Sequence, residues 1–166
     1  MKRLLLLCAL LPSVSFANDY DLGEGTFFKY GVGRKTPDQL GVSQVKTFSV
    51  GRQSSLLYIL DQKWEVGMWS DTVGNGRKSS GFGGWSMGIE PKLGSFYIHS
   101  FWGVIGITTT DTMLSTNLQF MQDLGVGLRD ARGVGIGAGY KHISNAGIKQ
   151  PNRGRDFFFV QLQIPL

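Results

Sequence analysis

The stretch Gly133-Val134-Gly135-Ile136-Gly137-Ala138-Gly139-Tyr140-Lys141-His142-Ile143-Ser144 decides the fold predicted for this chain. From Val134 to Tyr140 every second residue carries a larger side chain, and four glycines lie on the other side of the alternation. Because side chains of a β-strand point to opposite faces in turn, this stretch predicts a strand with one apolar face and one nearly bare face. His142 and Ser144 continue the apolar face.

The same period of two recurs along the chain in segments of roughly ten residues, a spacing typical of membrane β-barrel strands. The clearest further segments are 26–34, 63–71, 117–129 and the final strand, which alternates up to residue 166. Less regular candidates lie at about 44–59, 82–90 and 95–106. Together with residues 133–144 they predict eight strands.

The faces opposite the apolar ones carry a few charges, such as Lys63 and Glu65, and many of the 24 glycines. A soluble β-sandwich would bury its apolar faces between two sheets and leave its charges outside. Small and charged residues suit instead a narrow, filled barrel interior. We therefore predict an all-β fold, an eight-stranded antiparallel transmembrane β-barrel of the outer-membrane type, because only closure satisfies strand backbones in lipid.

The N-terminus has the pattern of a secretory signal peptide. Lys2 and Arg3 precede an apolar run, and Ser15-Phe16-Ala17 has the form of a cleavage site. We expect residues 1–17 to be removed and residues 18–166 to form a single barrel domain. The only cysteine, Cys8, lies within this signal, so a disulfide scaffold and a thiol nucleophile are both excluded.

The charge is mildly basic, at a formal +5 for the whole chain, and no basic helix accompanies it. A nucleic-acid partner is therefore not expected. The connections are expected to be short near residues 60–62, 90–94 and 129–133, and longer near 35–43, 73–81, 107–115 and 145–155. Outer-membrane barrels have short periplasmic turns and long external loops, so His142 and Ser144 are expected at the external rim.

The alternation of even and odd positions in the last strand places a third polar group on the same surface. In the last strand the even positions are apolar and outward, and Asp156 has the same parity. Polar side chains on a lipid face are costly, which suggests a function. Ser144 would be the nucleophile, His142 the general base and Asp156 the acid that orients the imidazole. Asn145, with the backbone amides of Ala146 and Gly147, would hold the oxyanion.

A simpler interpretation is that the strand ends near Tyr140 and that the following polar residues form a solvated loop. Tyr140 would then be an aromatic-girdle residue at the membrane interface. The other histidine, His99, is flanked by aromatic residues and is expected to be packed rather than catalytic.

The segment His142-x-Ser144-Asn145-Ala146-Gly147, followed by Lys149-Gln150-Pro151-Asn152-x-Gly154, resembles the lipid A 3-O-deacylases, the PagL-type outer-membrane enzymes. The resemblance implies a barrel that removes the ester-linked acyl chain at position 3 of lipid A with a Ser-His-acid triad and no cofactor. It also implies that a homodimer can form. By position, Asn152 would support the oxyanion or the loop. The acid of the family is usually glutamate, whereas this chain has Asp156, which is one methylene shorter.

The substrate would then be lipopolysaccharide in the outer leaflet of the bacterial outer membrane, with the site facing that leaflet. Two alternatives stay open: a non-catalytic small barrel that binds lipopolysaccharide, and an esterase or phospholipase acting on other outer-leaflet lipids. Basic residues in the long loops would contact the phosphates of the substrate. These candidates are Lys149, Arg153, Arg155, Arg77 and Lys78.

Overall fold

The computed structural model describes residues 24–34, 44–57, 59–71, 78–110 and 114–165. The predicted signal peptide and Arg77 lie outside these residues. The strands are β1 (Gly25–Arg34), β2 (Gln44–Leu57), β3 (Leu60–Asp71), β4 (Lys78–Ile89), β5 (Lys92–Leu93), β6 (Phe96–Ile107), β7 (Leu118–Arg129), β8 (Gly135–Ser144) and β9 (Arg155–Ile164).

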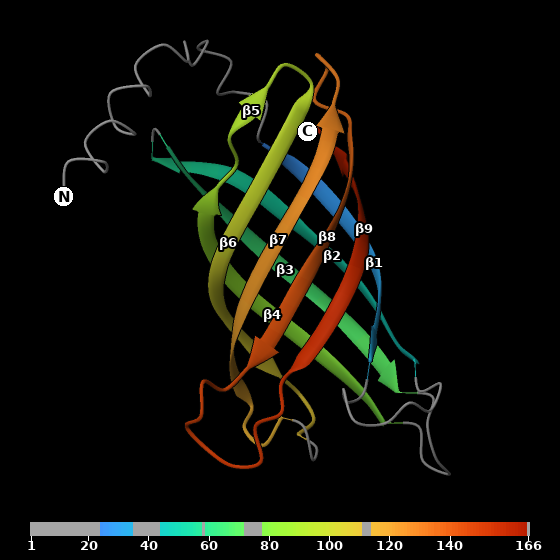
Figure 1. The fold of residues 1–166 in the computed structure, drawn as a ribbon, viewed down its shortest axis with the longest axis vertical. Helices are drawn as coiled ribbons and strands as arrows, with labels where there is room; N and C mark the ends of the chain where they lie inside the picture. Colours follow the sequence, from blue (N-terminus) through green and yellow to red (C-terminus); the bar gives the residue numbers. More distant parts are fainter. Residues whose placement is uncertain (1–23, 35–43, 58, 72–77, 111–113, 166) are drawn as a thin grey trace, which may run out of the picture.

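The strands form one closed antiparallel barrel (Figure 1). Each long strand pairs with its neighbour in the chain, β4 pairs with β6, and β1 closes the ring on β9. The two-residue β5 pairs only with the start of β6. This confirms the predicted barrel of eight long strands. Among the described residues no helix is long and apolar enough to cross a membrane.

The largest differences from the predicted strand boundaries are at the starts of β3 and β4. β3 starts at Leu60 rather than Lys63, and the pairing of β2 with β3 shifts register between Ser55 and Leu57. β4 starts at Lys78, in a segment predicted as loop, because the ladder with β3 continues to the pair Asp71–Lys78. Backbone pairing in an antiparallel ladder does not require apolar side chains, so polar ends of strands are not visible in the hydrophobic pattern.

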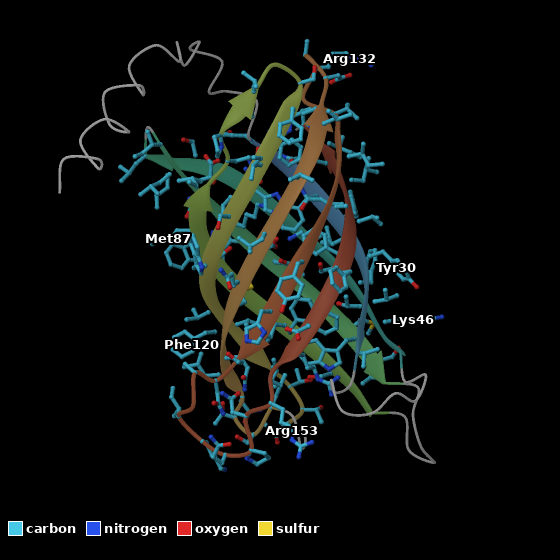
Figure 2. All side chains as sticks on the ribbon, in the orientation of Figure 1. Tyr30, Lys46, Met87, Phe120, Arg132 and Arg153 are labelled. Atoms are coloured by element: carbon cyan, nitrogen blue, oxygen red, sulfur yellow. The ribbon has the colours of Figure 1, made fainter. Side chains whose placement is uncertain are left out.

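The outward face of the barrel is apolar and exposed, as the alternation predicts. On β8 and β9, Ile136 is 63% exposed and Phe158 is 67% exposed. Figure 2 shows side chains extending outward around the wall, with Tyr30, Met87 and Phe120 among those labelled. An outward apolar surface on a closed barrel is the form in which strands cross a membrane.

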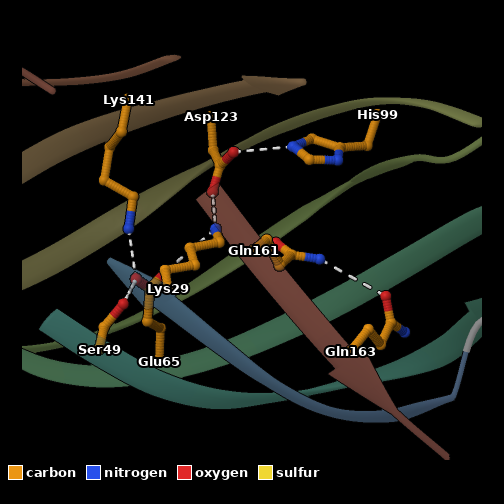
Figure 3. A network of polar contacts seen from close by, with 8 residues as sticks. All are labelled: Lys29, Ser49, Glu65, His99, Asp123, Lys141, Gln161 and Gln163. Carbon is orange, nitrogen blue, oxygen red and sulfur yellow. Dashed lines mark hydrogen bonds and ion pairs between the residues drawn. The ribbon is translucent and has the colours of Figure 1, made fainter. Parts of the chain in front are cut away.

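The interior holds a network of polar and charged side chains in contact with one another (Figure 3), together with a buried apolar cluster that includes Trp69, Ile143 and Phe157. Lys29 bonds to Asp123 and lies 3.7 Å from a Glu65 oxygen, while Lys141 bonds to the other Glu65 oxygen. His99 Nε2 lies 2.9 Å from Asp123, so this histidine is packed inside the barrel, as expected. Each of these side chains is almost completely buried. Buried charges of this kind are stable only when paired.

The barrel is too narrow for a side chain at some inward positions. A Cβ at Gly139 would lie 2.3 Å from the Leu124 carbonyl oxygen and 2.5 Å from the Phe159 ring. This explains why the inward face of β8 consists of glycine over most of its length. The same narrowness forces β8 to present its larger side chains outward, which sets the parity of the residues that follow.

The strand ends that border the four longer connections lie at one end of the barrel, where β1, β3, β6 and β8 finish and β2, β4, β7 and β9 begin. At this end β1 finishes opposite the start of β9, where Arg34 pairs with Asp156. The connection between β8 and β9 also lies here and carries Arg153, whereas Arg132 in the shorter β7–β8 connection lies at the other end (Figure 2). The end of β8 and the beginning of β9 therefore meet at the end with the long loops.

Candidate active site

His142 and Asp156 are direct partners across the antiparallel pair β8–β9. His142 Nδ1 lies 2.6 Å from Asp156 Oδ1. Both side chains are on the outward face, and they are 37% and 48% exposed. The strand pairing therefore fixes this contact directly, since residues opposite each other in an antiparallel pair have adjacent side chains.

The contact constrains the chemistry of the imidazole. A carboxylate accepts the Nδ1–H, and the proton then occupies Nδ1 while Nε2 keeps its lone pair. In this tautomer the free nitrogen of His142 can accept a proton from a hydroxyl group. The pair has the arrangement of a general base held by an acid.

Ser144 follows His142 by two residues on the same outward face of β8 and is partly exposed. At the rise of a β-strand, their Cα atoms are about 7 Å apart. Within the described part of the chain no hydrogen bond joins Ser144 to His142. Such bonds are often long before substrate binds and shorten in the complex. The structure thus brings the three predicted residues to one surface and hydrogen-bonds two of them.

Tyr140 also contacts the acid, which the sequence pattern did not indicate. Its hydroxyl donates a hydrogen bond of 2.6 Å to Asp156 Oδ1, the same oxygen that His142 contacts. Tyr140 precedes His142 by two residues on the same face. Its parity was visible in the sequence, but an aromatic residue at the end of a barrel strand is usually a girdle residue. Parity alone does not reveal the partner of the hydroxyl.

Gln122 is a second polar residue that the sequence analysis did not select. It is the direct partner of His142 across the β7–β8 pair, and it has outward parity. Its neighbours on the outward face of β7, Phe120 and Leu124, are apolar. The sequence does contain a signal for Gln122, because this residue interrupts an otherwise apolar face of the strand 117–129. His142 therefore lies between Gln122 on one side and Asp156 on the other.

The connection after Ser144 is held by the side chain of Asn145, which is fully buried. Its amide nitrogen donates to Ser115 Oγ at 3.1 Å and to the Lys149 carbonyl at 2.7 Å. Its amide oxygen accepts a 3.0 Å bond from the backbone N–H of Gly147. The backbone N–H of Asn145 in turn donates to Asn152 Oδ1 at 3.0 Å. One asparagine thus organises the whole connection.

This arrangement changes the predicted oxyanion contacts. The side chain of Asn145 does not fit the role of an oxyanion donor in this conformation, because its amide nitrogen already donates to the Lys149 carbonyl and to Ser115 Oγ in the connection between β6 and β7. The N–H of Gly147 is also engaged. Asn152 supports the loop through its side-chain oxygen. Ala146 is exposed, with a positive φ of 52°, and among the described residues its N–H makes no hydrogen bond.

The basic residues divide into two groups. Lys149 and Arg153 are exposed in the connection between β8 and β9. Arg155 is only 3% exposed and lies inside the barrel, with its guanidinium 5.8 Å from the Trp69 ring, so the prediction that it contacts substrate phosphates is wrong. Its odd parity in β9 points it inward. Lys78 starts β4 at the same end of the barrel.

No group of three or more His, Cys, Asp or Glu side chains in the described ranges could hold a metal ion. The chemistry of the outward cluster rests on a hydroxyl, an imidazole and a carboxylate. The fold places the protein in the class of small closed β-barrels with an apolar outer wall, and the outward surface of this barrel carries these three groups.

The family model for lipid A 3-O-deacylase (PagL) matches residues 60–165, which is more than half of the chain. The chain therefore belongs to this family, and the resemblance found in the sequence is confirmed. Family and fold together make it an outer-membrane β-barrel protein, as predicted.

One curated relative is the lipid A deacylase PagL of Pseudomonas aeruginosa, which is 38% identical over 61 residues. The match covers 37% of this chain and 35% of that relative, about a third of its length. The crystal structure of the outer membrane enzyme PagL is similar with a TM-score of 0.59 at 24% identity, and covers 84% of this chain and 99% of that chain. This second likeness shows the fold.

Proposed function

We propose that this protein is a serine esterase that hydrolyses the ester-linked acyl chain at position 3 of lipid A. Ser144 is the nucleophile, His142 the general base and Asp156 the acid that orients it. The observation that carries the proposal is the 2.6 Å contact of His142 Nδ1 with Asp156 on the same outward face as Ser144. Membership of the lipid A 3-O-deacylase family supports the choice of substrate.

The reaction follows from these groups. Ser144 Oγ attacks the carbonyl carbon of the acyl ester while its proton passes to His142 Nε2. The tetrahedral intermediate collapses, the bond to the sugar oxygen breaks, and His142 returns the proton to that oxygen. Water then attacks the acyl-enzyme with the same help from His142, and a free fatty acid leaves. These steps need no cofactor.

The position of the site suits a substrate that already lies in the membrane. The three side chains are outward-facing and at the end of the barrel with the long loops, next to exposed apolar residues such as Phe120 and Phe158. A lipid in the outer leaflet can present its ester sideways to this wall. Its sugar phosphates would lie at the level of Lys149 and Arg153, which are exposed in the adjoining loop.

For the oxyanion we propose the backbone N–H of Ala146 as the donor, with Asn145 and Asn152 holding the loop that presents it. A backbone N–H directed at the developing negative charge is the usual device of serine esterases. Gly147 shares the positive φ of this turn, at 82°, and its N–H is fixed on Asn145.

The test uses the purified protein in detergent with lipid A as substrate. We expect the native chain to release fatty acid and Ser144→Ala to release none above background, while both run as folded barrels on unheated gels. Removal of a triad nucleophile typically costs about 10⁶-fold in rate. Equal release by the two proteins would overturn the assignment of Ser144.

The same preparation separates the alternatives. Lipopolysaccharide binding without loss of an acyl chain would favour a non-catalytic barrel. Fatty-acid release from phospholipid-only vesicles would favour a phospholipase. The homodimer implied by the resemblance stays a prediction, which chemical cross-linking in native membranes would examine.

A further inference from the structure

One oxygen of Asp156 accepts two hydrogen bonds. Tyr140 donates its hydroxyl proton to Oδ1 at 2.6 Å, and His142 Nδ1 contacts the same atom at 2.6 Å. The three side chains come from two adjacent strands and lie on one outward face. The proposed triad therefore has a fourth polar member on the side away from Ser144.

The ring of Tyr140 is held in place by packing. Its partner across the β8–β9 pair is Phe158, and the two ring centroids are 5.6 Å apart at 59°. On the other side its partner is Leu124 of β7. A tyrosine ring has two rotatable angles, and contacts from both neighbouring strands restrict them. The packing of the ring therefore holds the Tyr140 hydroxyl in position beside Asp156.

We propose that Tyr140 is a positioning residue, which fixes the carboxylate of Asp156 and through it the orientation of His142. The proposal rests on the proposed function and adds a group to it. Asp156 is 48% exposed, so without this bond its carboxylate would be free to turn toward solvent. A hydrogen bond from a neutral donor to a charged oxygen is strong enough to prevent this.

A girdle tyrosine would behave differently. Its hydroxyl would meet water or lipid headgroups, and its removal would change membrane anchoring rather than the acid. Tyr30 on β1 provides this comparison, since it is outward-facing and 48% exposed. Tyr140→Phe and Tyr30→Phe each remove a single hydroxyl from the outward surface.

The kinetic test measures deacylation of lipid A by the native chain, Tyr140→Phe and Tyr30→Phe. We expect Tyr140→Phe to lower kcat by about tenfold or more, the worth of one hydrogen bond to a charged group, with KM changed less than twofold. Tyr30→Phe should leave both constants unchanged. An unchanged kcat in Tyr140→Phe, or a change in KM alone, would overturn the proposal.

A second measurement does not depend on activity. The chain has only two histidines, so ¹⁵N-labelled histidine gives few ring signals, and His142→Ala assigns those of His142. In the native protein we expect one tautomer, protonated at Nδ1. In Tyr140→Phe we expect a mixture of tautomers. Identical His142 signals in the two proteins would overturn the proposal.

The two measurements separate the proposals from each other. If the native chain and Ser144→Ala both leave lipid A intact, the proposed function fails and the ring signals of His142 alone decide the role of Tyr140. If the native chain is active and Tyr140→Phe matches it in rate and in ring signals, the proposed function stands and the positioning role fails.

Discussion

At the scale of single residues, the short acid of this chain is compatible with the triad geometry. The resemblance to the deacylase family implies glutamate at this position, and the sequence left open whether the shorter Asp156 reaches His142. The two residues are direct cross-strand partners, which places their Cα atoms about 5 Å apart. At that separation an aspartate reaches the imidazole, and the observed contact is 2.6 Å. Tyr140 occupies the other side of the carboxylate.

Gly154 controls the space around His142. It has a φ of +70°, and a Cβ built there would lie 2.8 Å from His142 Cε1. We expect Gly154→Ala to displace the imidazole and to lower deacylation at least tenfold, because small misplacements of catalytic groups cost up to about 10²-fold. Kinetics with lipid A in detergent would measure this.

Gly94 provides the matched control for this variant. Its φ is +60° and nothing lies within 4 Å of an added Cβ. Gly94→Ala therefore introduces similar backbone strain, about 1 kcal/mol, without touching the site. Equal losses of activity in the two variants would show that strain, rather than displacement of His142, explains the effect.

At the scale of elements, the connection between β8 and β9 depends on Asn145. We expect Asn145→Asp to lower activity strongly, because the carboxylate keeps the shape but cannot donate to Ser115 Oγ or to the Lys149 carbonyl. A buried acceptor left without its donor typically costs about 1–3 kcal/mol. Ser115→Ala removes only one of these partners and should have a smaller effect.

Deacylation kinetics measure the loss of activity, and limited proteolysis of the folded barrel measures the loss of order in the loop. We expect faster cleavage within residues 145–154 in Asn145→Asp than in the native chain. A variant with native activity and native resistance would contradict the role of Asn145 as the organiser of the loop.

The strands and the shared outward face of His142, Ser144 and Asp156 were predictable because both depend on the period of two. The same rule explains an error, since the parity that places Asp156 outward places Arg155 inward, where it is buried against Trp69. The contact of Asn145 with Ser115 was not predictable, because it joins residues 30 positions apart in two different connections. The start of β4 at Lys78 depends on backbone pairing, which carries no hydrophobic signal.

At the scale of the whole molecule, we expect the polar network inside the barrel to determine the stability of the fold but not the activity of the proposed site. Glu65 accepts bonds from Ser49 Oγ at 2.5 Å and from Lys141, and it lies 3.7 Å from Lys29. We expect Glu65→Gln to destabilise the barrel by about 3–5 kcal/mol, because it leaves the buried Lys141 without its carboxylate, while Lys29 keeps Asp123. Unfolding in urea, followed by gel mobility, would measure the loss.

The double variant Glu65→Met with Lys141→Met is the comparison. Removing both partners of a buried pair costs less than removing one, so this protein should be more stable than Glu65→Gln. Once folded, both variants should deacylate lipid A at the rate of the native chain, since the network lies inside the barrel wall and the proposed site lies outside it. A double variant less stable than Glu65→Gln would contradict this account of the interior.

The barrel explains why an outward polar cluster can be a site at all. A closed wall satisfies every strand backbone, and the apolar cluster that includes Ile143 and Phe157 packs behind the outward residues, so polar side chains can stand directly on the outward surface. The pairing of β8 with β9 sets their geometry and the loop 145–154 completes it. The account thus depends on one claim, that Ser144 on this surface cleaves a lipid ester in the surrounding leaflet.

The most direct test is the tandem mass spectrum of lipid A extracted from outer membranes that contain either the native chain or Ser144→Ala at equal amounts. We expect the native chain to remove one ester-linked acyl chain, located at position 3, and Ser144→Ala to leave lipid A intact. Lipid A unchanged by the native chain, or the same loss with Ser144→Ala, would contradict it.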